Sequence, residues 1–266
     1  MILANHGIIS SSGGALSFDA DALAFITAVS ITDNTQKTAV NTLVTDLKNA
    51  NIWTKMKAIY PFLGGTGAKH RFNLIKPTTL FSDFYMTFYG GGTHSANGWK
   101  CNGVDACSDT SIVPITHMAS NQNDMCFSAY VRDTVNNVLV GTDNNHRTVL
   151  APNRTGVGIY IPLNSTDGSV GTTAPTGGGF YMNTRLDNTT VKLFKNGSLI
   201  HSRTNVTTGL DNLPIYLGAR NTSPTPSVYS NNEIAFASIG SGLTDAEALA
   251  YYNAVQNYQS ILSRQV

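Results

Sequence analysis

The sequence has little charge of either sign. Lys, Arg, Asp and Glu together make up 12% of its 266 residues, and the formal net charge is +1. Binding to nucleic acid depends on an excess of Lys and Arg that neutralises phosphates, so this composition argues against a nucleic acid partner. Solubility must come from uncharged polar side chains, and 24 glycines provide turns between short segments of structure.

A long hydrophobic run is also missing. The longest apolar stretches, such as Met86–Tyr89 and Ile234–Ile239, are far shorter than the roughly 20 residues that a membrane-spanning helix needs. The first residues, Met1 to His6, have neither the positive charge nor the apolar run of a secretory signal. We therefore expect no membrane insertion and no signal peptide.

Cysteine is scarce, and the pattern of metal ligands is weak. Cys101, Cys107 and Cys126 are an odd number, which excludes a complete disulfide framework but leaves a Cys101–Cys107 pair open. The six histidines have no paired spacing that would predict a zinc site. Asp105 and Asp109 could bind a structural calcium ion, but their loop lacks the dense Asp, Asn and Gly pattern of calcium loops, which favours a solvated loop. We expect no cofactor and no metal.

Helices are expected at both ends of the chain. Residues 1–17 are small and polar, and they predict a flexible arm because they have too little apolar surface to fold. Within residues 18–55, helices are predicted to begin at Asp19 and near Asp33, where apolar residues recur at helical spacing. Near the other end, Thr244–Glu247 (TDAE) fits a capping box and predicts a C-terminal helix.

The long stretch between these helices has the pattern of many short antiparallel strands. Runs rich in Val, Ile, Phe and Tyr alternate with clusters of Gly, Asn, Pro and Ser, which is typical of all-β folds. Asn196-Gly197 lies between two apolar runs and predicts a tight hairpin. The candidate strands include Lys57–Phe62, Phe84–Tyr89, Met125–Arg132, Val138–Thr142, Gly158–Pro162 and Gly179–Thr184.

Three segments in the second half of the chain together resemble one known family. Leu193–Leu199 (LFKNGSL), Leu213–Ala219 (LPIYLGA) and Phe236–Gly240 (FASIG) resemble concanavalin A-like or laminin G-like jelly-roll domains, and the likeness covers residues 56–266. The helical segment 18–55 resembles the lead-in of bacteriophage virion proteins. The resemblance implies a mainly β fold: an antiparallel two-sheet jelly-roll β-sandwich with two N-terminal helices and one C-terminal helix.

The resemblance implies a structural or binding role. Glycosidases of this fold use two neighbouring carboxylates, usually Glu, and this sequence has two glutamates, Glu233 and the capping-box Glu247. We therefore expect a non-enzymatic bacteriophage protein on the virion surface, made in the host cytoplasm. It would decorate the capsid or form part of a tail fibre, contact other virion proteins and form a homo-oligomer. A stand-alone carbohydrate-binding module or adhesin is the alternative, and a polysaccharide hydrolase is disfavoured.

A glycan of the host surface is the expected ligand, and its candidate contacts lie close together in the sequence. Sugar binding needs an exposed aromatic ring that stacks on a pyranose, together with polar side chains. Trp99, at the end of the predicted loop that starts at His94, is the candidate ring, although a buried Trp is the commoner case. His94, Asn102 and Asp105 are the polar candidates around it. No catalytic residue is predicted.

Overall fold

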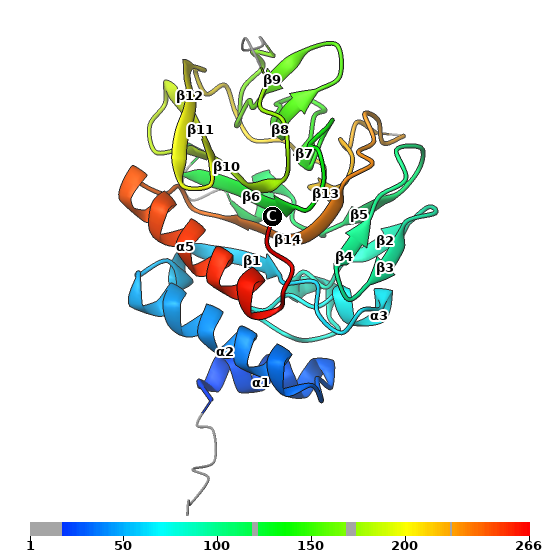
Figure 1. The fold of residues 1–266 in the computed structure, drawn as a ribbon. Coiled ribbons are helices and arrows are strands. Elements are labelled where there is room, and N and C mark those ends of the chain that lie inside the picture. Colours follow the sequence, from blue (N-terminus) through cyan, green and yellow to red (C-terminus); the bar gives the residue numbers. More distant parts are fainter. Residues whose placement is uncertain (1–17, 119–121, 169–173, 224) are drawn as a thin grey trace, which may run out of the picture.

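The molecule is a two-sheet β-sandwich with helices packed on one side (Figure 1). The computed structural model describes residues 18–118, 122–168, 174–223 and 225–266. The predicted arm, residues 1–17, lies outside the described residues. Within them, the mainly β, antiparallel two-sheet architecture expected from the sequence is confirmed.

The larger sheet, here called the helix-covered sheet, has eight strands. All of its pairings in the described part of the chain are antiparallel, and β1 (Met56–Tyr60) joins it by pairing with β14. The other strands, in spatial order, are β12 (Ser198–Thr204), β11 (Thr190–Lys195), β10 (Gly179–Arg185), β6 (Met125–Val131), β14 (Glu233–Gly240), β4 (Gly98–Lys100) and β3 (Thr93–Ser95).

The smaller sheet, here called the open sheet, has six strands. Its strands come from distant parts of the sequence, and β13 joins the two halves by pairing with both β5 and β7. In spatial order the strands are β2 (Thr87–Tyr89), β5 (Cys107–Asp109), β13 (Tyr216–Leu217), β7 (Val140–Thr142), β8 (Thr148–Arg154) and β9 (Gly158–Tyr160).

The long helices begin where the sequence predicts. Asp19 and Asp33 accept hydrogen bonds from backbone N–H groups of the first turns of their helices, and Thr244 forms the predicted capping box with Glu247. The long helices are α1 (Ala20–Val29), α2 (Asn34–Asn49) and α5 (Asp245–Ile261). The short helical turns are η1 (Trp53–Lys55), α3 (Gly67–His70), η2 (Phe81–Asp83) and α4 (Pro114–His117).

Two hydrophobic cores lie on opposite faces of the helix-covered sheet. Along β6, Phe127 and Ala129 point between the two sheets, whereas Cys126 and Tyr130 point toward the helices. Every residue of β6 is therefore buried, and the strand is almost continuously apolar. The long helices pack on this sheet and not on the open sheet.

None of the helices in the described part of the chain combines the length and the hydropathy needed to cross a bilayer.

Candidate functional site

Trp99 does not present a stacking surface, so its expected role is corrected. The predicted loop from His94 to Trp99 is a hairpin of β3 and β4, and the strand alternation turns the indole into the core. Trp99 is 1% exposed and packs between Phe62, with ring centroids 6.5 Å apart, and Phe88, at 4.9 Å. A sugar cannot reach either face of this ring.

Asn102 and Asp105 form a self-contained loop. The side-chain oxygen of Asn102 accepts hydrogen bonds from the backbone N–H groups of Val104, Asp105 and Ala106, and its amide donates to Asp105 Oδ1 at 2.6 Å. Asp105 Oδ1 also accepts from the Gly91 N–H at 2.9 Å, and these two bonds hold the pKa of Asp105 below its ordinary value. Both side chains are exposed, but most of their hydrogen bonds are made to the loop itself and to Gly91, so they stabilise the loop.

Three tyrosines lie together on the outer face of the open sheet. In β2 and β13, Phe88 and Leu217 face the core, so the alternating neighbours Tyr89 and Tyr216 face outward. Their ring centroids are 6.4 Å apart and their planes differ by 25°. Tyr229, from the loop before β14, is close enough to Tyr216 for the two phenols to interact electrostatically.

A carboxylate lies beside Tyr89 and Tyr216. Asp109 on β5 is the register partner of both Thr87 and Tyr216, so it sits between the flanking strands β2 and β13. Its Oδ1 accepts the Ser111 N–H at 2.7 Å, and its Oδ2 has no protein partner among the described residues. Partial burial raises the pKa of Asp109, and its nearby charge adds to the effect of burial in raising the pKa of Tyr216.

We call the set Tyr89, Asp109, Tyr216 and Tyr229 the tyrosine face. Tyr89 is 47% exposed and the other three side chains are half-buried, so ring surface and carboxylate oxygen are both accessible. The rest of the outer face is partly covered, since Val228 packs on the cluster formed by Val138, Val149, Ala151 and Tyr160. Strands β2, β5 and β13 lie away from α1, α2 and α5 (Figure 1).

A groove adjoins the tyrosine face across the edge strand β2. Its volume is about 290 Å³, and Thr87 connects it to the tyrosine face, because Thr87 lines the groove and is the register partner of Asp109. His94 reaches this groove, and its Nδ1 lies 2.9 Å from Nδ1 of the buried His70. The groove is lined by Gly67, Ala68, Arg71, Thr87, Phe88 and His94.

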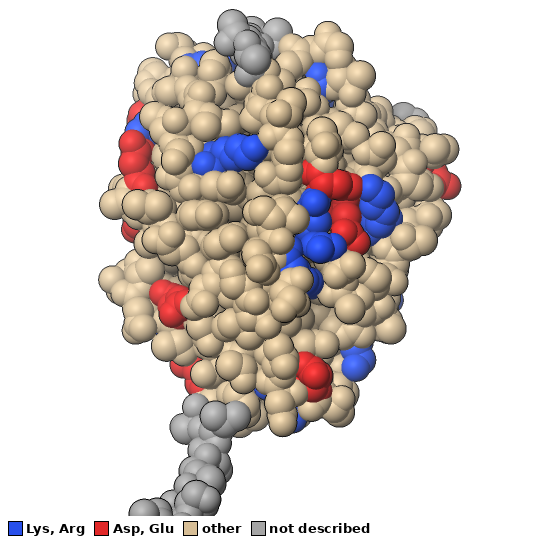
Figure 2. Space-filling model, in the orientation of Figure 1, with Lys and Arg blue, Asp and Glu red and all other residues tan. Residues whose placement is uncertain are grey.

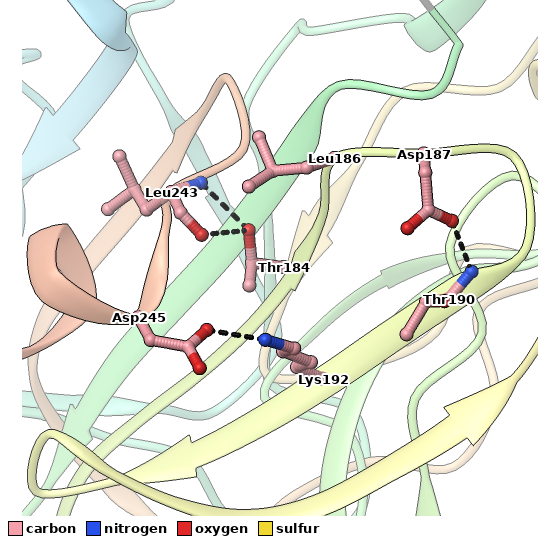
Figure 3. Close-up of a pocket in the computed structure, with 7 residues that line it drawn as sticks. All are labelled: Thr184, Leu186, Asp187, Thr190, Lys192, Leu243 and Asp245. Atoms are coloured by element: carbon pink, nitrogen blue, oxygen red, sulfur yellow. Dashed lines mark hydrogen bonds and ion pairs between the residues drawn. The ribbon is translucent and has the colours of Figure 1, made fainter.

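A second hollow, of about 120 Å³, lies between β10, β11 and the start of α5 (Figure 3). Its charged groups already have partners: Lys192 pairs with Asp245 at 2.6 Å, and Asp187 accepts the Thr190 N–H at 2.6 Å. The Thr184 hydroxyl is bonded to the backbone of Leu243. This small pocket therefore has few polar groups left for a ligand.

Neither metal ligation nor thiol chemistry is favoured by the geometry. The described residues contain no group of three or more His, Cys, Asp or Glu side chains placed to hold a metal ion. Cys101, Cys107 and Cys126 are buried free thiols, so the Cys101–Cys107 pair that the sequence left open is not formed. Burial raises the pKa of all three, in Cys107 to about 11, which keeps them protonated and unreactive.

The tyrosine face was not predicted from the sequence. A usable signal was present, because Thr87-Phe88-Tyr89 and Ile215-Tyr216-Leu217 each place a tyrosine opposite core residues in an alternating strand. The missing information was strand order. Only the pairing of β5 with both β2 and β13 brings Tyr89 and Tyr216 together.

The fold defines the class of protein, an antiparallel two-sheet β-sandwich, and solved structures share it. A mutant of Trypanosoma rangeli sialidase displaying trans-sialidase activity has a TM-score of 0.54 and 11% identity over 82% of this chain. The Trypanosoma rangeli sialidase in complex with a difluoro-KDN compound has a TM-score of 0.52 and 11% identity over 81% of this chain. This chain spans 39% of each of those sialidase chains.

A bacterial domain also matches, more distantly in geometry. Domain 4 of AbnA, a GH43 extracellular arabinanase from Geobacillus stearothermophilus in complex with arabinotriose, has a TM-score of 0.46 and 20% identity. That match covers 74% of this chain and 98% of the domain. No protein-family model and no curated protein matches the sequence. The likeness to the sialidases at 11% identity establishes the shared fold alone.

Proposed function

We propose that this chain is a non-enzymatic glycan-binding module that binds sugar through the tyrosine face. One observation carries the proposal: the accessible rings of Tyr89 and Tyr216 lie next to the carboxylate of Asp109 on the outer face of the open sheet, with Tyr229 near Tyr216. Aromatic faces match the apolar C–H face of a pyranose, and a carboxylate accepts hydrogen bonds from its hydroxyl groups. Asp109 Oδ2, which has no protein partner among the described residues, is placed for that second role.

A binding role without catalysis is supported by the use of the two glutamates. Glu233 pairs with Arg132 at 2.8 Å, and Glu247 pairs with Lys55 at 2.6 Å while it caps α5. Each carboxylate thus has a structural partner, whereas glycoside hydrolysis requires a proton donor and a second carboxylate placed across one sugar bond. On the tyrosine face, Asp109 would act as a hydrogen-bond acceptor. No metal is assigned a part in the binding.

The finer proposal concerns where the module works. We propose that it is displayed on a bacteriophage virion, on the capsid or the tail, where it binds glycans of the host surface as a homo-oligomer. The resemblance of residues 18–55 to virion lead-in segments and the low charge of 12% support this placement. Virion proteins occupy symmetric lattices, so an oligomer or attachment to other virion proteins is expected. The stand-alone module or adhesin is the competing placement.

Glycan binding is tested with a glycan array followed by titration of the best hit. Tyr216→Ala should weaken binding about tenfold, because it removes one stacking surface beside Asp109. Tyr252→Ala, on α5 at the other side of the molecule, is the control and should bind like the parent protein. A blank array, or equal affinity in parent and Tyr216→Ala, would count against the proposal.

The virion placement is tested separately. Antibodies against the purified protein should label intact phage particles in electron micrographs at regular positions on the capsid or tail. Light scattering of the purified protein should give the mass of an oligomer, or co-sedimentation should show attachment to particles. A monomer that binds glycans and never labels particles would instead support the stand-alone module.

A further inference from the structure

The groove beside the tyrosine face contains a cation that lacks an acidic partner. Arg71, the residue that ends α3, lines the groove, and no Asp or Glu of the described residues forms an ion pair with it. Arg132 and Arg220, by contrast, pair with Glu233 and Asp143. The other arginines without an ion pair among the described residues are Arg154, Arg185 and Arg264, and the last two are buried and donate to backbone carbonyl oxygens. Figure 2 shows a mostly uncharged face whose largest charged group contains both signs.

Arg71 is held in place without a carboxylate. Its Nε donates to the carbonyl oxygen of Met86, and its guanidinium lies 4.3 Å from the ring centroid of Tyr85. A second, longer contact joins its Nη2 to the Thr87 hydroxyl at 3.5 Å. These contacts fix the plane of the guanidinium, so little side-chain entropy remains to be lost when a ligand binds.

The rest of the groove allows a ligand to come close. Gly67 and Ala68 form a wall of minimal bulk, and a Cβ added at Gly67 would lie 3.1 Å from His94 Nε2. Phe88 contributes an apolar wall, and the Thr87 hydroxyl lies between Arg71 and the tyrosine face. None of the described residues that line the groove is acidic.

We infer that this groove binds an anionic substituent, a carboxylate or a phosphate, on the same glycan chain whose neutral ring stacks on the tyrosine face. The guanidinium presents a planar fork of N–H donors that matches two oxygens of either anion. This inference rests on the proposed glycan-binding function and adds the class of glycan: an acidic polysaccharide that contains both neutral and charged units. Asp105 and Asp109 repel anions from the other side of β2, so the charged unit must lie at the Arg71 end.

The first experiment uses small probes and the folded protein. Amide NMR spectra are recorded with glucuronate, with inorganic phosphate and with glucose at matched ionic strength. Glucuronate or phosphate should shift the signals of Gly67, Ala68 and Thr87, and glucose should not. Arg71→Gln should abolish these shifts, while Arg154→Gln, which removes a guanidinium stacked 4.8 Å from Tyr160, should leave them unchanged.

Two further variants test the inference even if Arg71→Gln does not fold. Arg71→Lys preserves the charge and loses the planar fork, so the shifts should weaken and not vanish. Gly67→Ala leaves every charge in place and narrows the groove next to His94, and it should also weaken the shifts. Anion shifts that survive in Arg71→Gln, or that are absent from the parent protein, would overturn the inference.

Titrations with oligosaccharides then distinguish a carboxylate from a phosphate as the bound anion. They also test the Arg71 groove separately from the tyrosine face. A hyaluronan oligosaccharide, which contains neutral and carboxylate-bearing rings, and a glucosylated glycerol phosphate oligomer are compared with a neutral malto-oligosaccharide by titration. Acidic chains should bind at least tenfold tighter than the neutral chain, with the difference lost in Arg71→Gln. Equal binding of acidic and neutral chains that depends on Tyr216 would overturn the inference and leave the proposed function standing. If acidic chains bind through Arg71 with the same affinity in the parent protein and in Tyr216→Ala, then one chain does not occupy both surfaces. That result would overturn both the inference and the proposed role of the tyrosine face.

Discussion

The buried His70, which is hydrogen-bonded to His94, makes the stability of the folded protein depend on pH. His70 is 1% exposed, donates or accepts one hydrogen bond with His94, and leaves its Nε2 without a partner among the described residues. Burial, followed by the charges of His94 and Arg264, lowers the pKa of His70 from 6.5 to about 3. The folded protein therefore holds this imidazole neutral where the unfolded chain would protonate it.

The sign of the pH dependence follows from this difference. Between pH 6.5 and about 3 the unfolded chain binds a proton that folded His70 does not, so stability is lost as pH falls through that window. We expect the free energy of unfolding in urea to drop by roughly 2 kcal/mol between pH 7 and pH 5 from this residue. His70→Gln should flatten the dependence, and His146→Gln should not. The same slope in all three proteins would contradict the assignment.

Trp99 shows what residue-level analysis of the sequence could and could not give. The sequence placed it after Asn97-Gly98 in a stretch that predicted a loop, and an exposed aromatic there suggested a sugar contact. The structure instead turns from β3 into β4 at Ala96-Asn97, with Gly98 as the first residue of β4, which makes Trp99 an inward strand residue. The side to which a three-residue strand points depends on its neighbours, and these are not encoded locally.

At the scale of elements, the hairpin of β11 and β12 was the strongest prediction and is confirmed. Lys195 and Ser198 are register partners on either side of Asn196-Gly197, and both turn residues have positive φ. Gly197 has φ +73, and a Cβ there would lie 2.8 Å from Leu249 Cδ1 on α5. The glycine therefore serves the turn and also lets the hairpin lie against the helix.

A pair of matched substitutions separates these two roles. Gly156 also has φ +73 but has no atom within 4 Å of an added Cβ. Gly156→Ala should cost about 1 kcal/mol from backbone strain, and Gly197→Ala should cost about 1 to 3 kcal/mol more from the clash with Leu249. Denaturant unfolding measures both. Equal losses would show that α5 adjusts without strain.

Other elements could be predicted only in part. The helix starts at Asp19, Asp33 and Thr244 were readable because capping is local chemistry. β8 was missed, and it contains Pro152, a residue that argues against a strand when the sheet around it is unknown. The proline is accommodated near the irregular pairing of β8 with β9, where the register shifts.

At the scale of the whole molecule, Arg264 joins the last residues of the chain to the sandwich. It is 2% exposed, and its guanidinium donates to the carbonyl oxygens of Phe62 at 3.0 Å and Ala235 at 3.1 Å and to Gln259 Oε1 at 2.9 Å. The segment after β1, the strand β14 and the end of α5 thus meet at one side chain. Buried carbonyls that lose such a donor are costly.

Replacing this residue tests whether the junction stabilises the entire fold. Arg264→Lys keeps a positive charge but cannot reach all of these acceptors, so we expect a loss of about 3 kcal/mol in the free energy of unfolding. Arg154→Lys, at a half-exposed position, should stay within about 0.5 kcal/mol of the parent protein. Calorimetry should show one lowered transition. A separate early transition would mean that the C-terminal segment melts independently.

The candidate site was the least predictable part of the molecule. Tyr89, Asp109 and Tyr216 come from three separated segments that only the order of strands in the open sheet places together, and Tyr229 joins them from the loop before β14. His94 was singled out from the sequence and does reach the adjoining groove, because it lies on the edge strand β3 near α3. The residue pattern predicted many short antiparallel strands and the resemblance to jelly-roll domains implied two sheets, but only the pairing of distant strands determines the surface.

The layering of helices, helix-covered sheet and open sheet also gives the molecule a front and a back. Residue 18 leads into α1 on the helical side (Figure 1), and the tyrosine face is on the outer face of the sheet that the long helices do not contact. If the chain is attached to a particle through the residues before residue 18, the helical side of every copy faces the particle. The open sheet of every copy then faces the solvent. Many weak sites held in parallel gain avidity without any change in the individual site. A single copy could then bind its ligand weakly and release it readily, while an array of copies stays attached.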